Sequence, residues 1–285
     1  MCIRDRPNIC VLENIKFGED ELKEYMDFIG RDLFTAPLQT TLHQFEEADN
    51  FGSLIRPDLT DVEEIVRVLD AKDVSGQLFL SETHKKVLQA LRQADYLSSK
   101  YHVVIANPPY MGGKGMNVRL AAWAKDNYRN SKSDLFAMFI ERNLELAQKY
   151  GAVSMITMQS WMFLPTFESM RRSMLTAAPP ISVAHLGVRA FDTIGGEVVS
   201  TTAFVLGKGY PTNTRSIFIR LIDGDSELEK ARLFIEALQD TWCNRVFTHS
   251  PEQFQRLPSA SLAYWVSEGV LGTFESDSIL SLIHI

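Results

Sequence analysis

The chain has 285 residues, of which 45% are hydrophobic and 23% are charged, and its formal net charge is −7. This composition is typical of a soluble globular protein with one large domain or two modest ones. The negative charge argues against a protein that coats DNA throughout, although it is compatible with a local basic cleft. No apolar run approaches the length of a membrane span. Three cysteines without ligand spacing and six scattered histidines favour a reduced, cytoplasmic protein without a metal site.

The two ends of the chain differ from the rest. The opening MCIRDR fits no helix, strand or targeting signal, and Leu282 to Ile285 are apolar without a cap. We therefore expect a fragment of a longer reading frame, with foreign residues at both ends.

The first hundred residues are predicted to be mostly helical. A short strand is expected over Asn8–Leu12, and helices are expected over Asp20–Ile29, Leu38–Ala48, Thr60–Leu69 and Ser81–Leu97. The third of these helices opens on the capping-box spacing Thr60-Asp61-Val62-Glu63. The apolar stripe of the last one consists of Val87, Leu88, Leu91 and Ala94.

The most informative stretch follows these helices. Val103–Ala106 is a β-branched apolar run, the pattern of a parallel strand buried on both faces. Pro108 and Pro109 end the strand, because proline cannot donate to a sheet ladder. Pro108 also biases Asn107 towards an extended conformation, so that its side chain stands at the carboxyl end of the strand. Ligands bind at that end of open α/β sheets, and Tyr110 comes directly after the two prolines.

Asn107-Pro108-Pro109-Tyr110 resembles the motif of amino methyltransferases that act on nucleic-acid bases. The 6-amino group of adenine is a poor nucleophile because its lone pair is delocalised into the ring. The resemblance implies that the Asn107 side-chain oxygen and the Pro108 carbonyl accept both amino hydrogens, which would aim the lone pair at a methyl sulfonium carbon. The base must first leave the duplex, and the ring of Tyr110 would stack on it.

The stretch Met111–Asn117 is rich in glycine, but its spacing is wrong for a P-loop. Two interpretations remain open. It is either a mobile loop beside the flipped base, with Lys114 near a phosphate, or a plain flexible turn.

The elements after this loop alternate between helix and strand. Ser133 is expected to cap a helix over Asp134–Tyr150, and Gly151 is expected to end it. The elements expected next are a strand over Ala152–Met158, a helix over Pro165–Leu175, and strands over Ile181–Leu186 and Ser200–Leu206. This order predicts a mainly parallel α/β sheet with one terminal antiparallel strand.

The character of the chain changes after residue 208. A strand is expected over Ile217–Ile222 and a helix over Ser226–Gln239, and Pro258–Trp265 is interpreted as the entry to a further module. We therefore expect a mostly helical part over 1–100 and the catalytic half of a domain over 101–208. The remaining residues, 209–285, would begin a target-recognition or linker region.

From Tyr101 to about Lys208, this order resembles the catalytic half of the gamma-class N6-adenine-specific DNA methyltransferases. The phrases NPPYMGGKGMN, NFGSLI and LAYWVS resemble the PglX methyltransferases of BREX type 1 phage-exclusion systems. The resemblance implies a Rossmann-like fold and methyl transfer from S-adenosylmethionine to adenine in double-stranded DNA, in phage defence or restriction-modification, with other defence proteins as partners. It makes Asn107, Pro108, Pro109 and Tyr110 the catalytic set. Phe191 would be a second aromatic on the flipped base, or else a core phenylalanine.

One departure from the family pattern concerns the cofactor. Family members carry a Phe-x-Gly-x-Gly-type loop before the motif, and no Gly-x-Gly precedes Asn107 here. Gly113-Lys114-Gly115 and Gly207-Lys208-Gly209 follow it, and Pro211 and Asn213 block a helix after the second. We therefore expect the cofactor-binding strands to lie upstream and the chain alone to be inactive, and we assign no cofactor-binding residue.

Two rival interpretations remain. The same motif serves related enzymes that methylate RNA or protein glutamine. Alternatively, the chain is a degenerate methyltransferase fold that binds nucleic acid or a partner without catalysis.

Overall fold

The computed structural model describes residues 8–30, 35–59, 61–74, 76, 78–192, 199–240, 242–267 and 269–270. The opening MCIRDR, the expected cap Thr60 and the last fifteen residues lie outside this part of the chain. The chain divides into two compact units, Met1–Ser99 and Lys100–Ile285.

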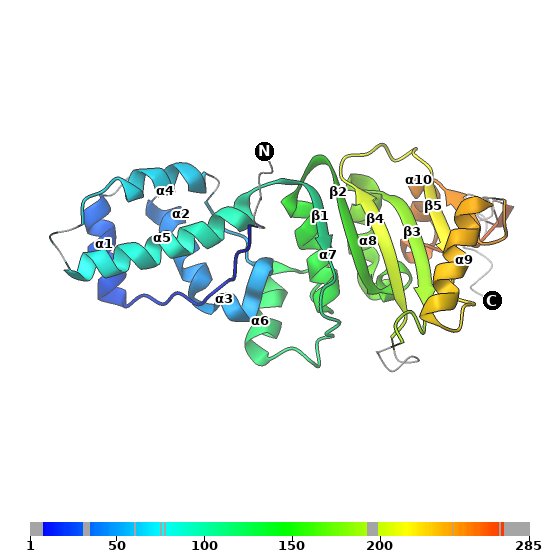
Figure 1. Ribbon diagram of the computed structural model, residues 1–285, viewed down its shortest axis with the longest axis horizontal. Helices are drawn as coiled ribbons and strands as arrows, with labels where there is room; N and C mark the ends of the chain where they lie inside the picture. Colours follow the sequence, from blue (N-terminus) through cyan, green and yellow to red (C-terminus); the bar gives the residue numbers. More distant parts are fainter. Residues whose placement is uncertain are drawn as a thin grey trace, which may run out of the picture. The chain divides into compact units, whose positions relative to one another are not determined.

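The first unit is helical, as predicted (Figure 1). Its helices are α1 (Glu19–Ile29), α2 (Thr35–Gln44), α3 (Ala48–Phe51), α4 (Val62–Asp70) and α5 (Leu78–Ser98). The predicted stripe of α5 is buried, and this helix contacts α1, α2 and α4. The strand predicted over Asn8–Leu12 is wrong, because the segment has no regular structure. Its Ile9 and Val11 are exposed, and no neighbouring strand satisfies its backbone within the described residues.

The second unit is built on a six-stranded sheet with the order β1-β2-β4-β3-β5-β6. The strands are β1 (Tyr101–Ala106), β2 (Ala147–Met158), β3 (Pro180–Gly187), β4 (Thr201–Gly207), β5 (Ser216–Arg220) and β6 (Val246–His249). β1 is parallel to β2 and β3 is parallel to β5, whereas β4 is antiparallel to both β2 and β3. The carboxyl ends of β1, β2, β3 and β5 therefore lie at one edge of the sheet.

The predicted α/β sheet, with most strands running in one direction, is confirmed. The antiparallel strand was predicted to be the terminal one. It is β4, and it lies inside the sheet, between β2 and β3. The sequence did not predict β6, a four-residue strand antiparallel to β5. Val246–His249 is too short and too mixed in composition to stand out as a strand.

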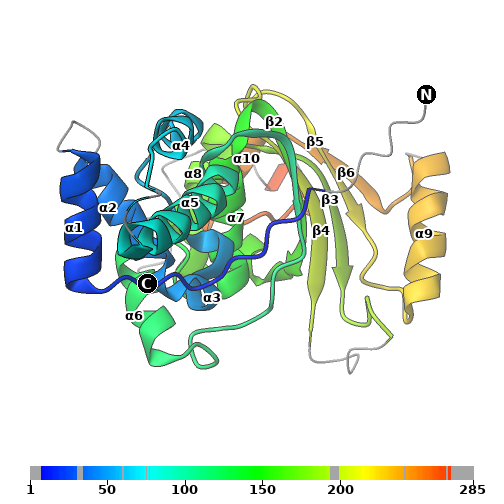
Figure 2. The ribbon, with the colours of Figure 1, turned by 60° about the vertical axis from the view of Figure 1, so that its left-hand side comes forward.

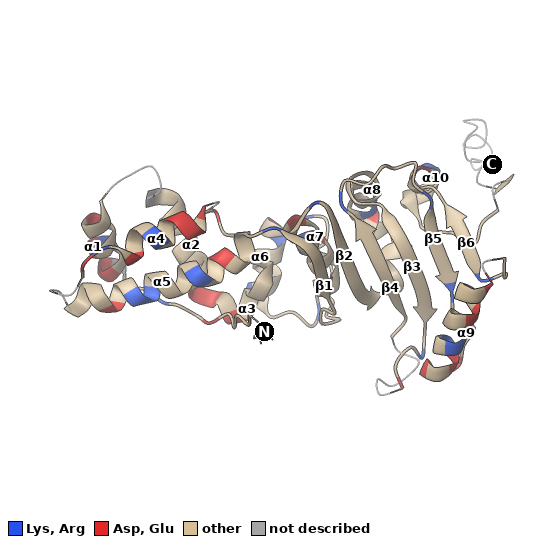
Figure 3. Cartoon of the chain, turned by 45° about the horizontal axis from the view of Figure 1, so that its top comes forward, with Lys and Arg blue, Asp and Glu red and all other residues tan. Residues whose placement is uncertain are grey.

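Helices cover both faces of the sheet. The described helices of this unit are α6 (Val118–Asn127), α7 (Leu135–Leu146), α8 (Glu168–Ala177), α9 (Glu227–Gln239) and α10 (Pro251–Arg256). Figure 2 shows α7 and α8 on one face and α9 on the other. Charged residues lie mainly on the helices, and β3 and β4 contain no Lys, Arg, Asp or Glu (Figure 3).

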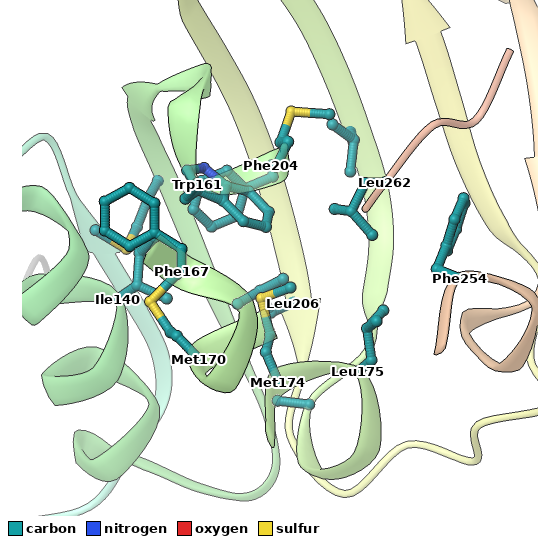
Figure 4. Packing of buried hydrophobic residues seen from close by; sticks show 14 of the residues in the cluster. Ile140, Trp161, Phe167, Met170, Met174, Leu175, Phe204, Leu206, Phe254 and Leu262 are labelled. Carbon is teal, nitrogen blue, oxygen red and sulfur yellow. The ribbon is translucent and has the colours of Figure 1, made fainter. Parts of the chain in front are cut away.

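The larger core lies between the sheet and helices α7 and α8, which cover one of its faces (Figure 4). Buried residues of this core that Figure 4 labels are Ile140, Trp161, Phe167, Met170, Met174, Leu175, Phe204, Leu206, Phe254 and Leu262. A smaller cluster under α9 contains Ile219, Leu221, Leu233 and Ala237. The sheet is therefore packed on both faces at β3 and β5.

Helix ends account for several differences from the predictions. The helix predicted to reach Tyr150 ends at Leu146, and β2 begins at once with Ala147. Tyr150 has a positive φ of 64°, which a helix does not allow. The cap of α7 is Asp134 rather than Ser133, because the Asp134 carboxylate accepts the Phe136 N–H. Helix α6 was not predicted.

The stretch predicted to open a further module belongs to the core of the sheet. Leu257, Ala260, Leu262 and Tyr264 are buried there, and the Leu262 N–H donates to the Met162 carbonyl at 2.9 Å. Pro258–Trp265 therefore completes the packing of this unit.

β1 differs from the prediction that it is buried on both faces. Val103 is 57% exposed and Ile105 is 77% exposed, whereas Val104 and Ala106 pack against the larger core. β1 is the first strand in the sheet order and has one neighbour, β2. Within the described residues, only one face of β1 is covered.

Candidate active site

The Asn-Pro-Pro-Tyr motif stands at the carboxyl edge of the sheet, as predicted. β1 ends at Ala106, and Asn107 follows it directly with an exposed side chain. Pro108 is buried and Pro109 is exposed. A proline restricts its own backbone and that of the residue before it. The backbone from which the Asn107 amide and the Pro108 carbonyl project is therefore fixed.

Tyr110 is half-buried, and its ring packs against the larger core. Its hydroxyl is buried and makes no hydrogen bond within the described part of the chain. Burial raises the pKa of this phenol above its ordinary value. The ring is therefore anchored on one side, and the hydroxyl does not hold it through a hydrogen bond.

The loop after the motif is joined to the start of α7 by backbone hydrogen bonds. The Gly113 N–H donates to the Ser133 carbonyl at 3.1 Å, and the Leu135 N–H donates to the Met111 carbonyl at 3.0 Å. Burial raises the pKa of the Asp134 carboxyl beside this loop. Lys114 lies in the same turn and is exposed.

The segment after β2 is held by a buried arginine. The Arg171 guanidinium donates to the carbonyls of Trp161 at 2.6 Å and Leu164 at 2.7 Å, through Nη1. It also donates to the carbonyls of Ser259 at 2.6 Å, through Nη2, and Ala260 at 3.2 Å, through Nε. Desolvation is the main cause that lowers the pKa of Arg171 to about 10, so the group stays charged at neutral pH. One side chain thus connects the segment after β2 to the C-terminal stretch.

A hydrogen-bonded network lies at the same edge, at the end of β3. His185 is 5% exposed. Its Nε2 is 2.6 Å from Oε1 of Gln159, which follows β2, and its Nδ1 is 2.7 Å from the Tyr264 hydroxyl. Burial, and then the charges of Arg220 and Lys230, lower the pKa of His185 to about 4. The imidazole is therefore neutral at neutral pH.

Phe191 is half-buried in the loop after β3 and therefore follows a strand that ends at the same edge. The sheet order places β2 and β4 between β1 and β3. Within the described residues, no ring contact joins Phe191 to Tyr110.

Neither Gly-x-Gly sequence fits a cofactor loop. Gly207–Gly209 follows β4, which runs in the opposite direction, so this turn lies at the edge away from Asn107. Its Gly207 and Gly209 N–H groups donate to the carbonyls of Pro179 and Ala177. In the other sequence, Gly115 donates to Gly112, and a Cβ at Gly115 would lie 2.9 Å from the Met111 side chain. These N–H groups are already used by the chain, so the residues do not fit S-adenosylmethionine.

The described residues contain no group of three or more His, Cys, Asp or Glu side chains placed to hold a metal ion. Their helices include none with the length and apolar character needed to span a membrane.

The motif lies inside a segment that matches a known family. Residues 35–191, more than half of the chain, match the model of the Eco57I restriction-modification methylase. The chain belongs to the Eco57I methylase family. It is 36% identical over 242 residues to the adenine-specific methyltransferase BrxX of Escherichia coli O9:H4 (strain HS), covering 83% of this chain and 19% of that protein.

A second relative agrees with the first. The adenine-specific methyltransferase PglX of Lacticaseibacillus casei (strain Zhang) is 36% identical over 255 residues, covering 87% of this chain and 21% of that protein. The chain thus spans about a fifth of the length of these relatives. Among solved structures, a nuclease-deletion mutant of the Type ISP restriction-modification enzyme LlaGI is 15% identical with a TM-score of 0.45, covering 73% of this chain and 18% of that one.

Sequence reasoning missed four residues that shape this edge of the Eco57I-family chain: Gln159, Arg171, His185 and Tyr264. Gln159 follows a predicted strand as Asn107 does, so the same rule could have indicated it. His185 and Tyr264 are 79 residues apart, and Arg171 binds Ser259 and Ala260, 88 and 89 residues away, so these three give no local signal.

Proposed function

We propose that this chain carries the target-base site of an enzyme that methylates the 6-amino group of adenine in DNA. The observation that carries the proposal is Asn107-Pro108-Pro109-Tyr110 at the carboxyl end of β1, inside the segment that matches the Eco57I methylase model. Both curated relatives are named adenine-specific methyltransferases. We extend to this chain the restriction-modification setting that the name of the Eco57I model states, or the phage-defence setting that the resemblance to BREX methyltransferases implies.

The proposed chemistry begins with two acceptors. The Asn107 side-chain oxygen and the Pro108 carbonyl accept the two hydrogens of the amino group. This arrangement favours a more tetrahedral nitrogen and directs its lone pair away from the ring. The acceptors act by position and electrostatics, and no covalent intermediate with the enzyme is needed.

The aromatic residues of the site hold the extruded base. Tyr110 stacks on one face of the adenine, and its anchored ring does not have to be ordered when the base arrives. Phe191, in the loop after β3, supplies a second ring. Lys114 is exposed in the loop after the motif and pairs with a DNA phosphate.

The methyl donor in this proposal is S-adenosylmethionine, which supplies an electrophilic sulfonium methyl group. The two Gly-x-Gly sequences of this chain use their N–H groups internally. We therefore place the cofactor-binding residues outside them. The partner is a DNA duplex with the target adenine rotated out of the stack.

The decisive experiment compares single-turnover methylation of duplex DNA by the full-length protein and its Asn107→Ala variant. Losing an acceptor that acts mainly in the transition state should slow the chemical step by roughly 10²–10³, with little change in cofactor affinity. Asn213→Ala is the matched control, because Asn213 is an exposed asparagine that follows β4 at the opposite edge. It should methylate at the parental rate.

Three outcomes would contradict the proposal. An Asn107→Ala variant as fast as the parent would show that Asn107 is not the acceptor. Methylation of RNA or of a glutamine peptide in place of DNA would identify a different substrate. Binding of DNA without methylation of any of these substrates would indicate a degenerate fold that only docks.

A further inference from the structure

The segment after β2 places an amide side chain between the two parts of the proposed base site. Ala106 of β1 pairs with Met155, and β2 continues to Met158 before Gln159 begins. β2 therefore extends about 10 Å further along the sheet direction than the end of β1, and Gln159 follows its last residue. Because β2 lies between β1 and β3 in the sheet, Gln159 also lies between Asn107 and the loop that carries Phe191.

The hydrogen atoms of the network can be assigned from the buried tyrosine. Tyr264 is fully buried, and its hydroxyl contacts Nδ1 of His185 at 2.7 Å. If Nδ1 carried the proton, the phenol hydrogen would be left without an acceptor in a buried position, which costs about 1–3 kcal/mol. The Tyr264 O–H therefore donates to Nδ1, and the single proton of the neutral His185 ring lies on Nε2.

This assignment fixes the orientation of the Gln159 amide. A protonated Nε2 donates, so the atom 2.6 Å away must be the amide oxygen. The same assignment leaves the amide nitrogen of Gln159 for a ligand, and this nitrogen makes no hydrogen bond within the described residues. The backbone is held as well, because the Gln159 N–H donates to the Ser200 carbonyl at 2.9 Å.

We infer that Gln159 is a base-recognition residue, held as a hydrogen-bond donor by the Tyr264–His185 pair, and that it donates to a ring nitrogen beside the adenine amino group. This inference rests on the proposed adenine methylation. Adenine has an unprotonated ring nitrogen on each side of its 6-amino group, N1 on one side and N7 on the other. Asn107 would accept from the amino group while Gln159 donates to one of these nitrogens. His185 and Tyr264 are positioning residues, since they act through Gln159.

The test uses the full-length protein and a duplex whose target position has been mapped with the parental enzyme. The target adenine is replaced by 1-deazaadenine or 7-deazaadenine, each of which has C–H in place of one ring nitrogen. Gln159→Ala should lower kcat/KM on adenine about tenfold, the effect of one lost hydrogen bond. On one of the two analogues, the kcat/KM of the parent should fall by a similar factor. The kcat/KM of Gln159→Ala should not fall further on that analogue.

A second variant separates recognition from structure. Gln159→Glu keeps an oxygen that accepts from His185, but it replaces the amide nitrogen with an oxygen that repels a ring-nitrogen lone pair. If Gln159 only supports the fold, Gln159→Glu should be close to the parent. If Gln159 recognises the base, it should be slower than Gln159→Ala on adenine, and this difference should vanish on the sensitive analogue.

The outcomes distinguish this inference from the function on which it rests. A parental enzyme that forms no N6-methyladenine would refute the proposed function itself. An active parent with an inactive Asn107→Ala variant, but Gln159 variants at the parental rate, would overturn only the role of Gln159. Equal losses by Gln159→Ala on adenine and on both analogues would also overturn it, because the effect would not depend on a ring nitrogen.

Discussion

β1 and β3 end at the same edge of the sheet, but they differ in strand pairing and in burial. In the described part of the chain β1 has one neighbouring strand, and its Val103 and Ile105 are 57% and 77% exposed. β3 is paired on both sides, and its His185 is 5% exposed. Asn107 and Tyr110 thus follow the least buried of these strands, whereas His185, which positions Gln159, lies in the core. Changes near β1 should alter rate with little effect on folding, whereas changes around β3 should alter stability.

The largest expected effect is a loss of stability when a buried residue of the core is replaced. Arg171→Leu removes the donor to four backbone carbonyls, those of Trp161, Leu164, Ser259 and Ala260. Each carbonyl that stays buried without a donor costs about 1–3 kcal/mol. We expect the free energy of unfolding to fall by about 4 kcal/mol or more, measured by urea denaturation.

Its neighbour on the same helix is the control. Arg172 is about half exposed and pairs with Glu168 at 2.9 Å. Arg172→Leu should change the free energy of unfolding by less than about 1 kcal/mol. If both arginine variants unfolded at the same urea concentration, the buried guanidinium would not be the connection that we describe.

The next effect is a dependence of stability on pH that originates at His185. The folded pKa is about 4, below the ordinary value of about 6.5 for the unfolded chain. Above pH 6.5 the ring is neutral in both states, and its full contribution to stability is present. As the pH falls towards 4, the unfolded chain takes up a proton that the folded chain does not. Stability should therefore fall by about 3 kcal/mol.

Two histidine variants test the origin of this slope. His185→Gln should flatten the pH dependence of the free energy of unfolding between pH 7 and pH 4. His43→Gln is the control for replacing a histidine outside the core, because the His43 side chain is 50% exposed and contacts Glu46. A slope that survived in His185→Gln would place the titrating group elsewhere.

The smallest effect concerns Tyr110 beside β1. Tyr110→Phe removes a hydroxyl that is buried without a partner in the described part of the chain, so stability should stay equal or rise. Base stacking should survive because the ring remains. Tyr110→Ala should weaken binding of the flipped base by about 1–3 kcal/mol, as reported by a fluorescent base analogue at the target position. Equal damage from both variants would show that the hydroxyl matters and that stacking does not explain the residue.

The motif could be predicted from the sequence because its causes are local. Two prolines after a β-branched run end a strand whatever lies around it, so the place of Asn107 follows from its immediate neighbours. The supporting network has no such signal. His185 is 26 residues from Gln159 and 79 residues from Tyr264, and these residues meet only because the sheet brings them together.

Strand burial and helix ends were harder to predict for a related reason. The run Val103–Ala106 has the composition of a strand covered on both faces, but the exposure of Val103 and Ile105 depends on what packs against the sheet. Similarly, Leu135–Tyr150 is apolar enough for one long helix. Tertiary pairing of Ala147 with Tyr101 ends that helix early.

The place of β4 has a consequence for the order in which the sheet can form. β3 pairs with β4 and β5, and both lie later in the chain. β1 and β2 can pair as soon as residue 158 has been synthesised, but β3 has no described partner until residue 201 leaves the ribosome. A nascent chain that has emerged only as far as residue 200 would therefore display an unpaired apolar strand, a state that favours misassembly and chaperone binding. In a nascent chain stalled at that point, hydrogen exchange should show protection of β1 and β2 and none of β3.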